Sequence, residues 1–293
     1  MDNKTIAVIS MGDMGHAVGR SLRESGHEVI TCLAGRSAKT LKMAERAGVR
    51  DVESLDNVVD EAEILLSILP PSSALQLAQD TMKARKENGR QLIYVDCNAI
   101  SPATAKEIAT TIDSAGAKFI DSGIIGFAPG KDTPRFYVSG EDTSAMQGLD
   151  GCGFSVIHCG ETPGQASATK MCYAALTKGT FTLHTALLMA ANSLGVYETV
   201  IEEFRFSQAS VLQAMENRVP FIPADSERWI GEMEEIANTF RKAGVTGSFH
   251  DGAAAVLEVL AKTPFAQETR ESLDHTRTLD QAIGEYVKHI QTD

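Results

Sequence analysis

The sequence predicts a doubly wound, mostly parallel α/β sheet followed by an all-α domain. Apolar runs of strand length alternate with helical patterns up to about residue 160, and only helical patterns follow. An apolar run over 5–10, a glycine turn, a helical pattern up to Gly26 and a second apolar run over 28–33 form a strand–turn–helix–strand unit. Such a βαβ unit is typical of a Rossmann-type, dinucleotide-binding domain.

The glycine turn carries the predicted phosphate site. Gly12 would let the backbone approach a pyrophosphate, Gly15 would let helix and strand pack closely, and the start of the helix offers free N–H groups to the anion. Ser10 occupies the position of the first glycine in the G-x-G-x-x-G pattern. A tight turn that binds no nucleotide is the alternative. The cofactor contacts expected from this turn are Ser10, Gly12, Asp13, Met14 and Gly15.

The end of the second strand indicates which nucleotide binds. An NAD site usually has Asp or Glu there for the ribose 2′-hydroxyl, but no acid stands between Leu33 and Ser37. Arg36 and Ser37 suit a 2′-phosphate instead. We therefore expect NADP(H) as the cofactor, with NAD(H) less favoured. The alternative is that Arg36 is a solvated loop residue.

Strand and helix patterns continue to alternate after Arg36. The middle strands are continuous apolar runs, which suit parallel strands buried on both faces. The last two are expected to be antiparallel edge strands. The predicted strands are 49–52, 64–69, 92–96, 118–122, 135–139 and 155–157, and the predicted helices are 38–47, 73–86 and 102–115.

The pattern changes character at Gly160. The sequence Thr162-Pro163-Gly164-Gln165 predicts a capping box with proline at the first helical position, opening a helix that runs to about residue 194. We place the domain boundary there. Residues 1–162 are expected to form a dinucleotide-binding Rossmann domain, and residues 163–293 an all-α substrate and dimerisation domain.

The composition argues against several classes of partner and site. The net charge of −12 disfavours nucleic acid or an anionic membrane. Five cysteines without a C-x-x-C pair predict neither a disulfide framework nor a zinc site, and we expect no metal. The apolar stretch 173–196 contains Lys178 and His184, so a buried helix is expected rather than a membrane span. Because the first strand begins close to Met1, we expect no targeting peptide and a cytoplasmic protein.

A series of motifs resembles the 6-phosphogluconate/β-hydroxyacid dehydrogenase superfamily over essentially the whole chain. Each motif alone is weak, but their order is specific. The likeness is strongest to the branch labelled NAD-binding phosphogluconate dehydrogenase-like, with an uncharacterised C-terminal domain, which shares Gly35-Arg36-Ser37 and a motif over 228–235. The other matching motifs are Gly12-Asp13-Met14-Gly15, Leu69-Pro70-Pro71, the stretch 95–102, the stretch 121–126 and the stretch 164–170.

This resemblance implies a Rossmann domain, an all-α domain and an active site in the cleft between them. Members of the superfamily transfer a hydride between nicotinamide and a small hydroxyacid or its carbonyl form. Their catalytic lysine falls on Lys170; a buried lysine is suited to exchanging a proton near neutral pH. The alternative is a surface charge early in a helix. The resemblance further implies cofactor contacts at Leu69, Pro70 and Asn98, and substrate contacts at Ser122, Gly123, Ile124, Thr177 and Lys178.

Two departures from the family pattern alter the expected pocket. Ala174 stands where asparagine commonly binds the reacting oxygen, and Ile125-Gly126-Phe127 replaces the Ser-Gly-Gly that receives a substrate carboxylate. Tyr173, three residues after Lys170 on the same helical face, is a candidate replacement proton donor. His184 is expected in the core or in a dimer contact.

We therefore expect an NADP-dependent oxidoreductase of the β-hydroxyacid dehydrogenase type, forming a homodimer through its α-domain. It would transfer a hydride between nicotinamide and the C–OH/C=O of a small, acid-bearing substrate. An imine (C=N) reductase is the alternative enzyme, and a non-catalytic NADPH-binding regulator is the alternative outside enzymes. Arg228 and Glu232 are expected to form an intrahelical ion pair, with Trp229 in the core or a dimer interface.

Overall fold

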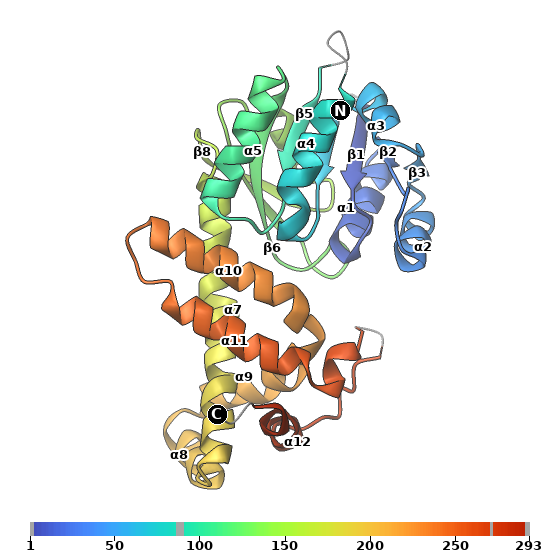
Figure 1. The fold of residues 1–293 in the computed structure, drawn as a ribbon. Helices are drawn as coiled ribbons and strands as arrows, with labels where there is room; N and C mark the ends of the chain where they lie inside the picture. The colour runs from blue at the N-terminus through green and yellow to red at the C-terminus, as the bar shows by residue number, and fades with distance from the viewer. Residues whose placement is uncertain (1–2, 86–90, 270–271, 291–293) are drawn as a thin grey trace. The chain divides into compact units, whose positions relative to one another are not determined.

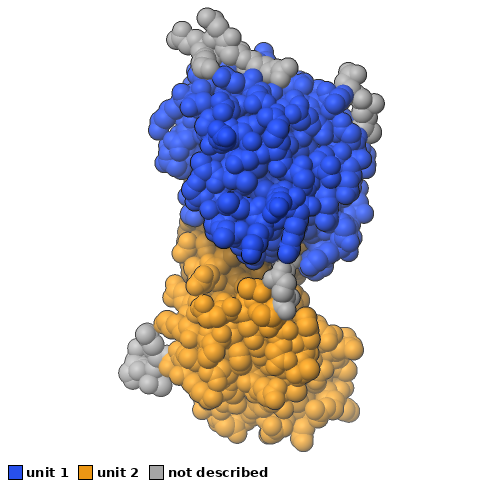
Figure 2. All heavy atoms as spheres, turned by 90° about the vertical axis from the view of Figure 1, so that its right-hand side faces the viewer, with its two compact units in different colours: residues 1–171 blue, residues 172–293 orange. Residues whose placement is uncertain are grey.

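The computed structural model describes residues 3–85, 91–269 and 272–290. The chain divides into two compact units, residues 1–171 and 172–293, which Figure 2 distinguishes by colour. The first unit contains the sheet, and the second is helical throughout its described elements. The predicted fold class is confirmed.

The first unit is built on one sheet, which has eight strands within the described residues, in the order β3-β2-β1-β4-β5-β6-β7-β8 (Figure 1). Neighbouring strands from β3 to β6 pair in parallel. The strand order reverses between β1 and β4, and α/β sheets bind ligands outside the carboxyl ends of the strands at such a point. The strands are β1 (Thr5–Ile9), β2 (Glu28–Thr31), β3 (Arg50–Asp51), β4 (Ile64–Ser67), β5 (Ile93–Asp96), β6 (Lys118–Ile125), β7 (Arg135–Ser139) and β8 (Ser155–Gly160).

Helices pack on both faces of this sheet, because successive residues of a strand point to opposite sides. Val8 of β1 belongs to a buried cluster with Leu22, whereas its neighbour Ala7 belongs to a second cluster with Ile108. The helical elements of this unit are α1 (Asp13–Glu24), α2 (Ala38–Ala47), α3 (Leu55–Glu61), η1 (Pro71–Ser73), α4 (Ala74–Ala84), α5 (Pro102–Ser114) and α6 (Ser144–Gln147).

The last two strands differ in part from the prediction. Strand β7 pairs antiparallel with β6, as expected, but it lies between β6 and β8 and is not an edge strand. Strand β8 forms the edge and pairs with β7 in parallel. Burial agrees with these positions, since β7 contains three buried residues and β8 none. Local hydropathy predicts a strand but not its neighbours in the sheet.

Helix α7 (Gln165–Ser193) is the long unbroken helix that the sequence predicts. Its 29 residues correspond to roughly 43 Å at about 1.5 Å per residue. The Gln165 side chain accepts a hydrogen bond from the Thr162 backbone N–H at 2.9 Å, which is one half of the predicted capping box. The helix begins at Gln165, however, so Pro163 lies in the turn before it and does not occupy the predicted first helical position.

The carboxylate of Asp121 on β6 caps the start of this helix from a distance in sequence. It accepts hydrogen bonds from the backbone N–H groups of Gly164 at 2.8 Å and Ser167 at 3.0 Å, and from the hydroxyls of Ser167 at 2.6 Å and Ser139 at 3.0 Å. The Ser139 hydroxyl also accepts from the N–H of Ala166 at 3.0 Å. Burial raises the pKa of Asp121, and these hydrogen bonds oppose the shift. The first turn of α7 is thereby attached to β6 and β7.

The second unit contains the remaining helices, which supply its buried core. Trp229, Met233 and Ile236 form a buried stripe on one helix, which agrees with a core position for Trp229. The rings of Phe240 and His250 meet at 4.6 Å between the centroids and join two helices. In the part of the chain that the structure describes, no helix is long and apolar enough to span a bilayer. The elements are α8 (Tyr197–Ser207), α9 (Ala209–Arg218), η2 (Val219–Asp225), α10 (Ser226–Lys242), α11 (Ser248–Ala261), η3 (Pro264–Gln267), α12 (Leu279–Tyr286) and η4 (Val287–His289).

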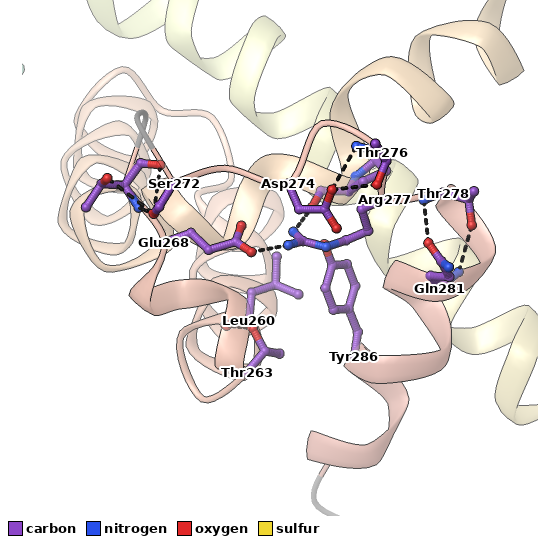
Figure 3. Close-up of polar contacts among 12 residues, drawn as sticks. Leu260, Thr263, Glu268, Ser272, Asp274, Thr276, Arg277, Thr278, Gln281 and Tyr286 are labelled. Carbon is purple, nitrogen blue, oxygen red and sulfur yellow. Dashed lines mark hydrogen bonds and ion pairs between the residues drawn. The ribbon is translucent and has the colours of Figure 1, made fainter.

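A buried arginine anchors the C-terminal segment of this unit (Figure 3). Arg277 donates to the Pro220 carbonyl at 2.9 Å and pairs with Glu268, and its guanidinium carbon lies 3.6 Å from the ring centroid of Phe265. A buried charge is tolerated where a carboxylate and a carbonyl satisfy it in this way. Arg277 therefore joins the segment before α12 to η2 and η3.

Replacement of Asp121 by alanine should lower the free energy of unfolding by at least about 3 kcal/mol, because a buried unsatisfied donor costs about 1–3 kcal/mol and the carboxylate serves several. Asp121→Asn keeps one acceptor oxygen and should have a smaller effect. Urea denaturation followed by far-UV circular dichroism measures both. The exposed Asp113→Ala, on α5, is the matched control and should stay within about 0.5 kcal/mol. A loss below about 1 kcal/mol for Asp121→Ala would contradict the cap.

Candidate cofactor and catalytic site

The turn between β1 and α1 has the geometry of a phosphate cradle. Gly12 is the N-cap of α1, and a Cβ added to it would meet no atom within 4 Å, so the backbone is open to approach. A Cβ on Gly15 would lie 1.8 Å from the Ser10 carbonyl oxygen, so only glycine fits this contact. Asp13 and Met14 form the first turn of α1. This geometry fits an anion held by the N–H groups at the helix start.

The other predicted cofactor residues lie at the same edge of the sheet. Parallel strands place their carboxyl ends together, so Ser10 after β1 and the pair Leu69-Pro70 after β4 are neighbours at the switch point. The Ser10 N–H donates to the Ile68 carbonyl at 3.1 Å, which joins the two segments. The structure therefore brings the turn residues together with Leu69 and Pro70.

Asn98 braces this edge through its side-chain amide. Its amide nitrogen donates to Ser67 Oγ and to Asp96 Oδ2, both at 2.8 Å, and its oxygen accepts from the Leu69 N–H at 2.5 Å. Asp96 is fully buried and also accepts from the Asn98 N–H at 3.0 Å. Burial raises the pKa of Asp96 to about 7, although the hydrogen bonds from Asn98 lower it. The side chain of Asn98 thus positions the segment after β4.

Arg36 and Ser37 lie in the loop between β2 and α2. Arg36 is exposed. The Ser37 hydroxyl caps α2 by accepting from the Thr40 N–H at 3.3 Å. The nearest acid on β3, Asp51, accepts the Leu33 N–H at 3.0 Å, so one of its oxygens is engaged with the backbone of this loop.

Lys170 is held against the end of β6. Its ammonium donates to the carbonyl of Ile124. A Cβ on Gly123 would lie 2.8 Å from both Lys170 Cβ and the Ala166 carbonyl oxygen, so the absence of a side chain there allows α7 to approach the strand. Ser122 is buried on the same strand. The structure thus brings Gly123 and Ile124 together with Lys170, within the first unit.

Three further predicted residues belong to the second unit. Tyr173 is 46% exposed. The Thr177 hydroxyl donates to the Tyr173 carbonyl at 3.2 Å, within its own helix. Lys178 forms an ion pair with Glu232, and its Nζ lies 5.2 Å from the ring centroid of Trp229.

Sequence reasoning missed the roles of three acids. Asp96 and Asp121 organise the carboxyl edge of the sheet through their hydrogen bonds. The signal available in the sequence was an acidic residue at the end of an apolar strand (Asp96) or within one (Asp121). Glu232 forms the predicted ion pair with Arg228 at 2.7 Å. Its second pair, with Lys178, depends on the packing of α7 against α10 and has no local signal.

Within the described residues, no cluster of three or more His, Cys, Asp or Glu side chains is arranged to hold a metal ion. The five cysteines are free thiols. His184 is buried beside Phe181, and burial lowers its pKa.

Family models match parts of both units. The family model for the NAD binding domain of 6-phosphogluconate dehydrogenase matches residues 5–149, and a domain of unknown function, DUF1932, matches residues 191–260. An uncharacterized 28.5 kDa protein from Methanothermus fervidus is 31% identical over 67% of this chain and 74% of its own length. The mitochondrial 3-hydroxyisobutyrate dehydrogenase of Drosophila melanogaster is 28% identical over 58% of this chain, and the match spans about half of that enzyme (52%).

Solved structures extend the likeness to most of the chain. A conserved protein, MTH1747, described as similar to 3-hydroxyacid dehydrogenases, is 27% identical with a TM-score of 0.65, covering 87% of this chain and 97% of its own. The 3-hydroxyisobutyrate dehydrogenase of Mycobacterium tuberculosis shares the fold with a TM-score of 0.69 at 20% identity, covering 96% and 98% of the two chains. A reductive aminase from Aspergillus terreus shares it with a TM-score of 0.57 at 19% identity, covering 96% and 99%. With the glycine turn, the sheet order and the lysine of α7 held against the end of β6, the family models and the sequence relatives show that the chain belongs to the 6-phosphogluconate/β-hydroxyacid dehydrogenase superfamily of NAD(P)-dependent dehydrogenases.

Proposed function

We propose that this protein is an NADP-dependent oxidoreductase that transfers a hydride between nicotinamide and the C–OH/C=O of a small, acid-bearing substrate. The observation that carries the proposal is the position of Lys170. Its ammonium is held at the carboxyl edge of the sheet by the Ile124 carbonyl, and the glycine turn lies at that same edge. A proton-exchanging group and a dinucleotide cradle at one edge are the two parts that such a reaction requires.

The residues present fit a dinucleotide phosphate. Gly12 leaves the backbone open, and the first N–H groups of α1 have no intrahelical partners and attract an anion. Met14, in the first turn of α1, and the segment Leu69-Pro70, which follows β4, border this turn. When bound, nicotinamide supplies or accepts the hydride. The protein's part is to orient that group and exclude competing reactions.

The preference for a 2′-phosphate rests on the loop after β2. Arg36 is exposed and offers a planar guanidinium that suits phosphate. No acid lies between Leu33 and Ser37, and an oxygen of Asp51 is engaged by the loop backbone. An NAD site usually has a carboxylate at this position to accept the ribose 2′-hydroxyl.

Lys170 serves as the proton-transfer residue in this proposal. Reduction of a carbonyl leaves an alkoxide, which must gain a proton, and the reverse reaction requires a base. The Ile124 carbonyl holds the ammonium in place by accepting one of its three N–H bonds. The substrate contacts at Ser122, Gly123, Ile124, Thr177 and Lys178 remain part of the proposal.

An imine reductase is the second candidate, because Ala174 replaces the asparagine that commonly binds the reacting oxygen. The retained lysine favours the carbonyl reaction. Absorbance at 340 nm separates the candidates: NADPH oxidation with keto acids alone supports the first, whereas oxidation only with preformed cyclic imines supports the second. No oxidation with either class would favour the NADPH-binding regulator.

Cofactor choice should depend on Arg36. We expect NADPH to bind at least tenfold more tightly than NADH, a difference of about 1.4 kcal/mol. Arg36→Ala should remove most of this preference by weakening the binding of NADPH, while the affinity for NADH stays nearly unchanged. Calorimetric titration measures both, with Arg46→Ala, another exposed arginine on the next helix, as the control. Equal affinities in the unmutated protein would rule out the NADP assignment.

Turnover should depend on Lys170. The change Lys170→Met keeps the apolar stem and removes the ammonium, so turnover should fall by about 10²–10⁴-fold while NADPH affinity changes little. Steady-state assays with 3-hydroxyisobutyrate and a panel of related hydroxyacids measure this. Lys118→Met, at the exposed start of β6, is the control. If Lys170→Met stayed near normal and Tyr173→Phe abolished turnover, the proton would belong to Tyr173.

Assembly as a homodimer through the second unit is also part of the proposal. Leu176 and Leu183 on α7 are 69% and 63% exposed, which leaves apolar surface on a long helix. A dimer that covers it should bury over about 2,000 Å², the obligate range. Sedimentation velocity at micromolar concentration should therefore show a dimer, and a monomer at that concentration would contradict the proposal.

A further inference from the structure

The side-chain amide of Asn98 uses both of its N–H bonds within the protein. Asn98 is 2% exposed, at the carboxyl edge of the sheet. Its amide nitrogen donates to Ser67 Oγ and to Asp96 Oδ2, both at 2.8 Å, and its oxygen accepts from the Leu69 N–H. An amide nitrogen has two N–H bonds, so neither is left to donate to a ligand. The contact of Asn98 that leads toward the cofactor turn is therefore the one with the backbone of Leu69.

Two neighbours of opposite character determine which way this amide faces. The Leu69 N–H can only donate, so it requires the amide oxygen, whereas an ionised Asp96 carboxylate can only accept, so it requires the amide nitrogen. Ser67 does not discriminate, because a hydroxyl donates as well as accepts. If the amide turned over, its nitrogen would face the Leu69 N–H and its oxygen would face the carboxylate. Asp96 thus keeps the oxygen of Asn98 on Leu69.

Asp96 is held in this position by the sheet and by the turn that follows β5. It is fully buried and is the register partner of Ser67 on β4. Its Oδ1 accepts from the Asn98 backbone N–H at 3.0 Å, which is the contact of an Asx turn. Its other oxygen, Oδ2, accepts from the Asn98 side chain. The acid and the amide therefore belong to one turn, in which the position of each determines that of the other.

We propose that Asp96 is a positioning residue for cofactor binding, which orients the Asn98 amide so that the Leu69-Pro70 segment is held where it contacts the nicotinamide dinucleotide. In this arrangement Asp96 and Asn98 touch no part of the cofactor, and they act through the Leu69 N–H. The inference rests on the proposed function, because Leu69 and Pro70 are cofactor contacts only if a dinucleotide binds at the glycine turn.

The change Asp96→Asn tests this role at pH 8, where the carboxylate, whose pKa burial raises to about 7, is ionised. Whichever way an amide at position 96 faces, one of the hydrogen bonds that fix Asn98 to it or to Leu69 is lost, because two donors then meet. Without cofactor, hydrogen exchange of the Leu69 amide, measured by NMR, should accelerate at least about fivefold relative to that of Leu66 within β4. In calorimetry NADPH should bind at least about fivefold more weakly. Loss of a negative charge alone would instead tighten the binding of an anionic cofactor.

The exchanged pair, Asp96→Asn with Asn98→Asp, separates this role from a general disturbance of the core. A carboxylate at position 98 accepts from the Leu69 N–H, from the Ser67 hydroxyl and from an amide at position 96, whose oxygen accepts the backbone N–H of residue 98. Every hydrogen bond is restored and the net charge is unchanged. Leu69 exchange and NADPH affinity should therefore return to within about twofold of the unmutated protein, whereas two independent disturbances would add.

Asp113→Asn, which removes one exposed carboxylate on α5, is the matched control and should change neither measurement. Unchanged Leu69 exchange in Asp96→Asn, or an exchanged pair as impaired as the single variant, would overturn the inference. Faster Leu69 exchange with normal NADPH affinity would also overturn it, while leaving the proposed function intact. If Asp96→Asn does not fold, the exchanged pair decides, because its failure to fold or to bind NADPH contradicts the inference. An unmutated protein that binds neither NADPH nor NADH would overturn the proposed function itself, and this role with it.

Discussion

The geometry of the candidate catalytic site depends on the carboxylate of Asp121. A helix leaves its first N–H groups without intrahelical partners, and a negative charge at that end is favourable. Asp121 meets both needs at α7 by accepting from Gly164 and Ser167. Because Lys170 follows Ser167 by three residues on the same helix, this cap also determines which way the lysine points. The lysine then reaches the Ile124 carbonyl on the strand that carries Asp121.

Two buried acids join neighbouring segments at the carboxyl edge of the sheet through hydrogen bonds. Asp96 and Asp121 are register partners on β5 and β6, burial raises the pKa of each, and the charge of Asp121 adds to the shift at Asp96. Hydrogen bonds donated to each carboxylate offset the cost of burying it in the core. Asn98 joins β5 to the segment after β4, while Ser139 joins Asp121 to β7. Side-chain hydrogen bonds therefore brace strands that carry predicted cofactor contacts, and sites on rigid elements hold their geometry best.

Structural features that are determined by residues close together in the sequence could be predicted. Features that depend on contacts between residues far apart in the sequence could not. The βαβ unit, the sheet class and the length of α7 follow from hydropathy, glycine placement and capping residues, and the structure confirms them. The interior position of β7 depends on which strands become neighbours, which no local pattern encodes. The capping box at Thr162 was predicted from four adjacent residues, yet the carboxylate at the start of α7 comes from Asp121. Likewise, the spacing of Arg228 and Glu232 predicts their pair, but not the pair of Glu232 with Lys178.

Strand β6 and the residues just after it bear on two different parts of the candidate site. Gly123 affects the position of Lys170, whereas residues 125–127 bear on how an acid group of the substrate is bound. Any side chain at Gly123 would collide with Lys170 Cβ and the Ala166 carbonyl, so the close contact of α7 with β6 tolerates no substitution without movement. At Ile125-Gly126-Phe127 the hydroxyl that usually receives a substrate carboxylate is absent, and Phe127 is 61% exposed. The chain thus keeps the geometry that holds the lysine while it lacks the usual hydroxyl for an acid group. The acid-bearing substrate that we propose would therefore need hydrogen-bond donors other than a hydroxyl at these three positions.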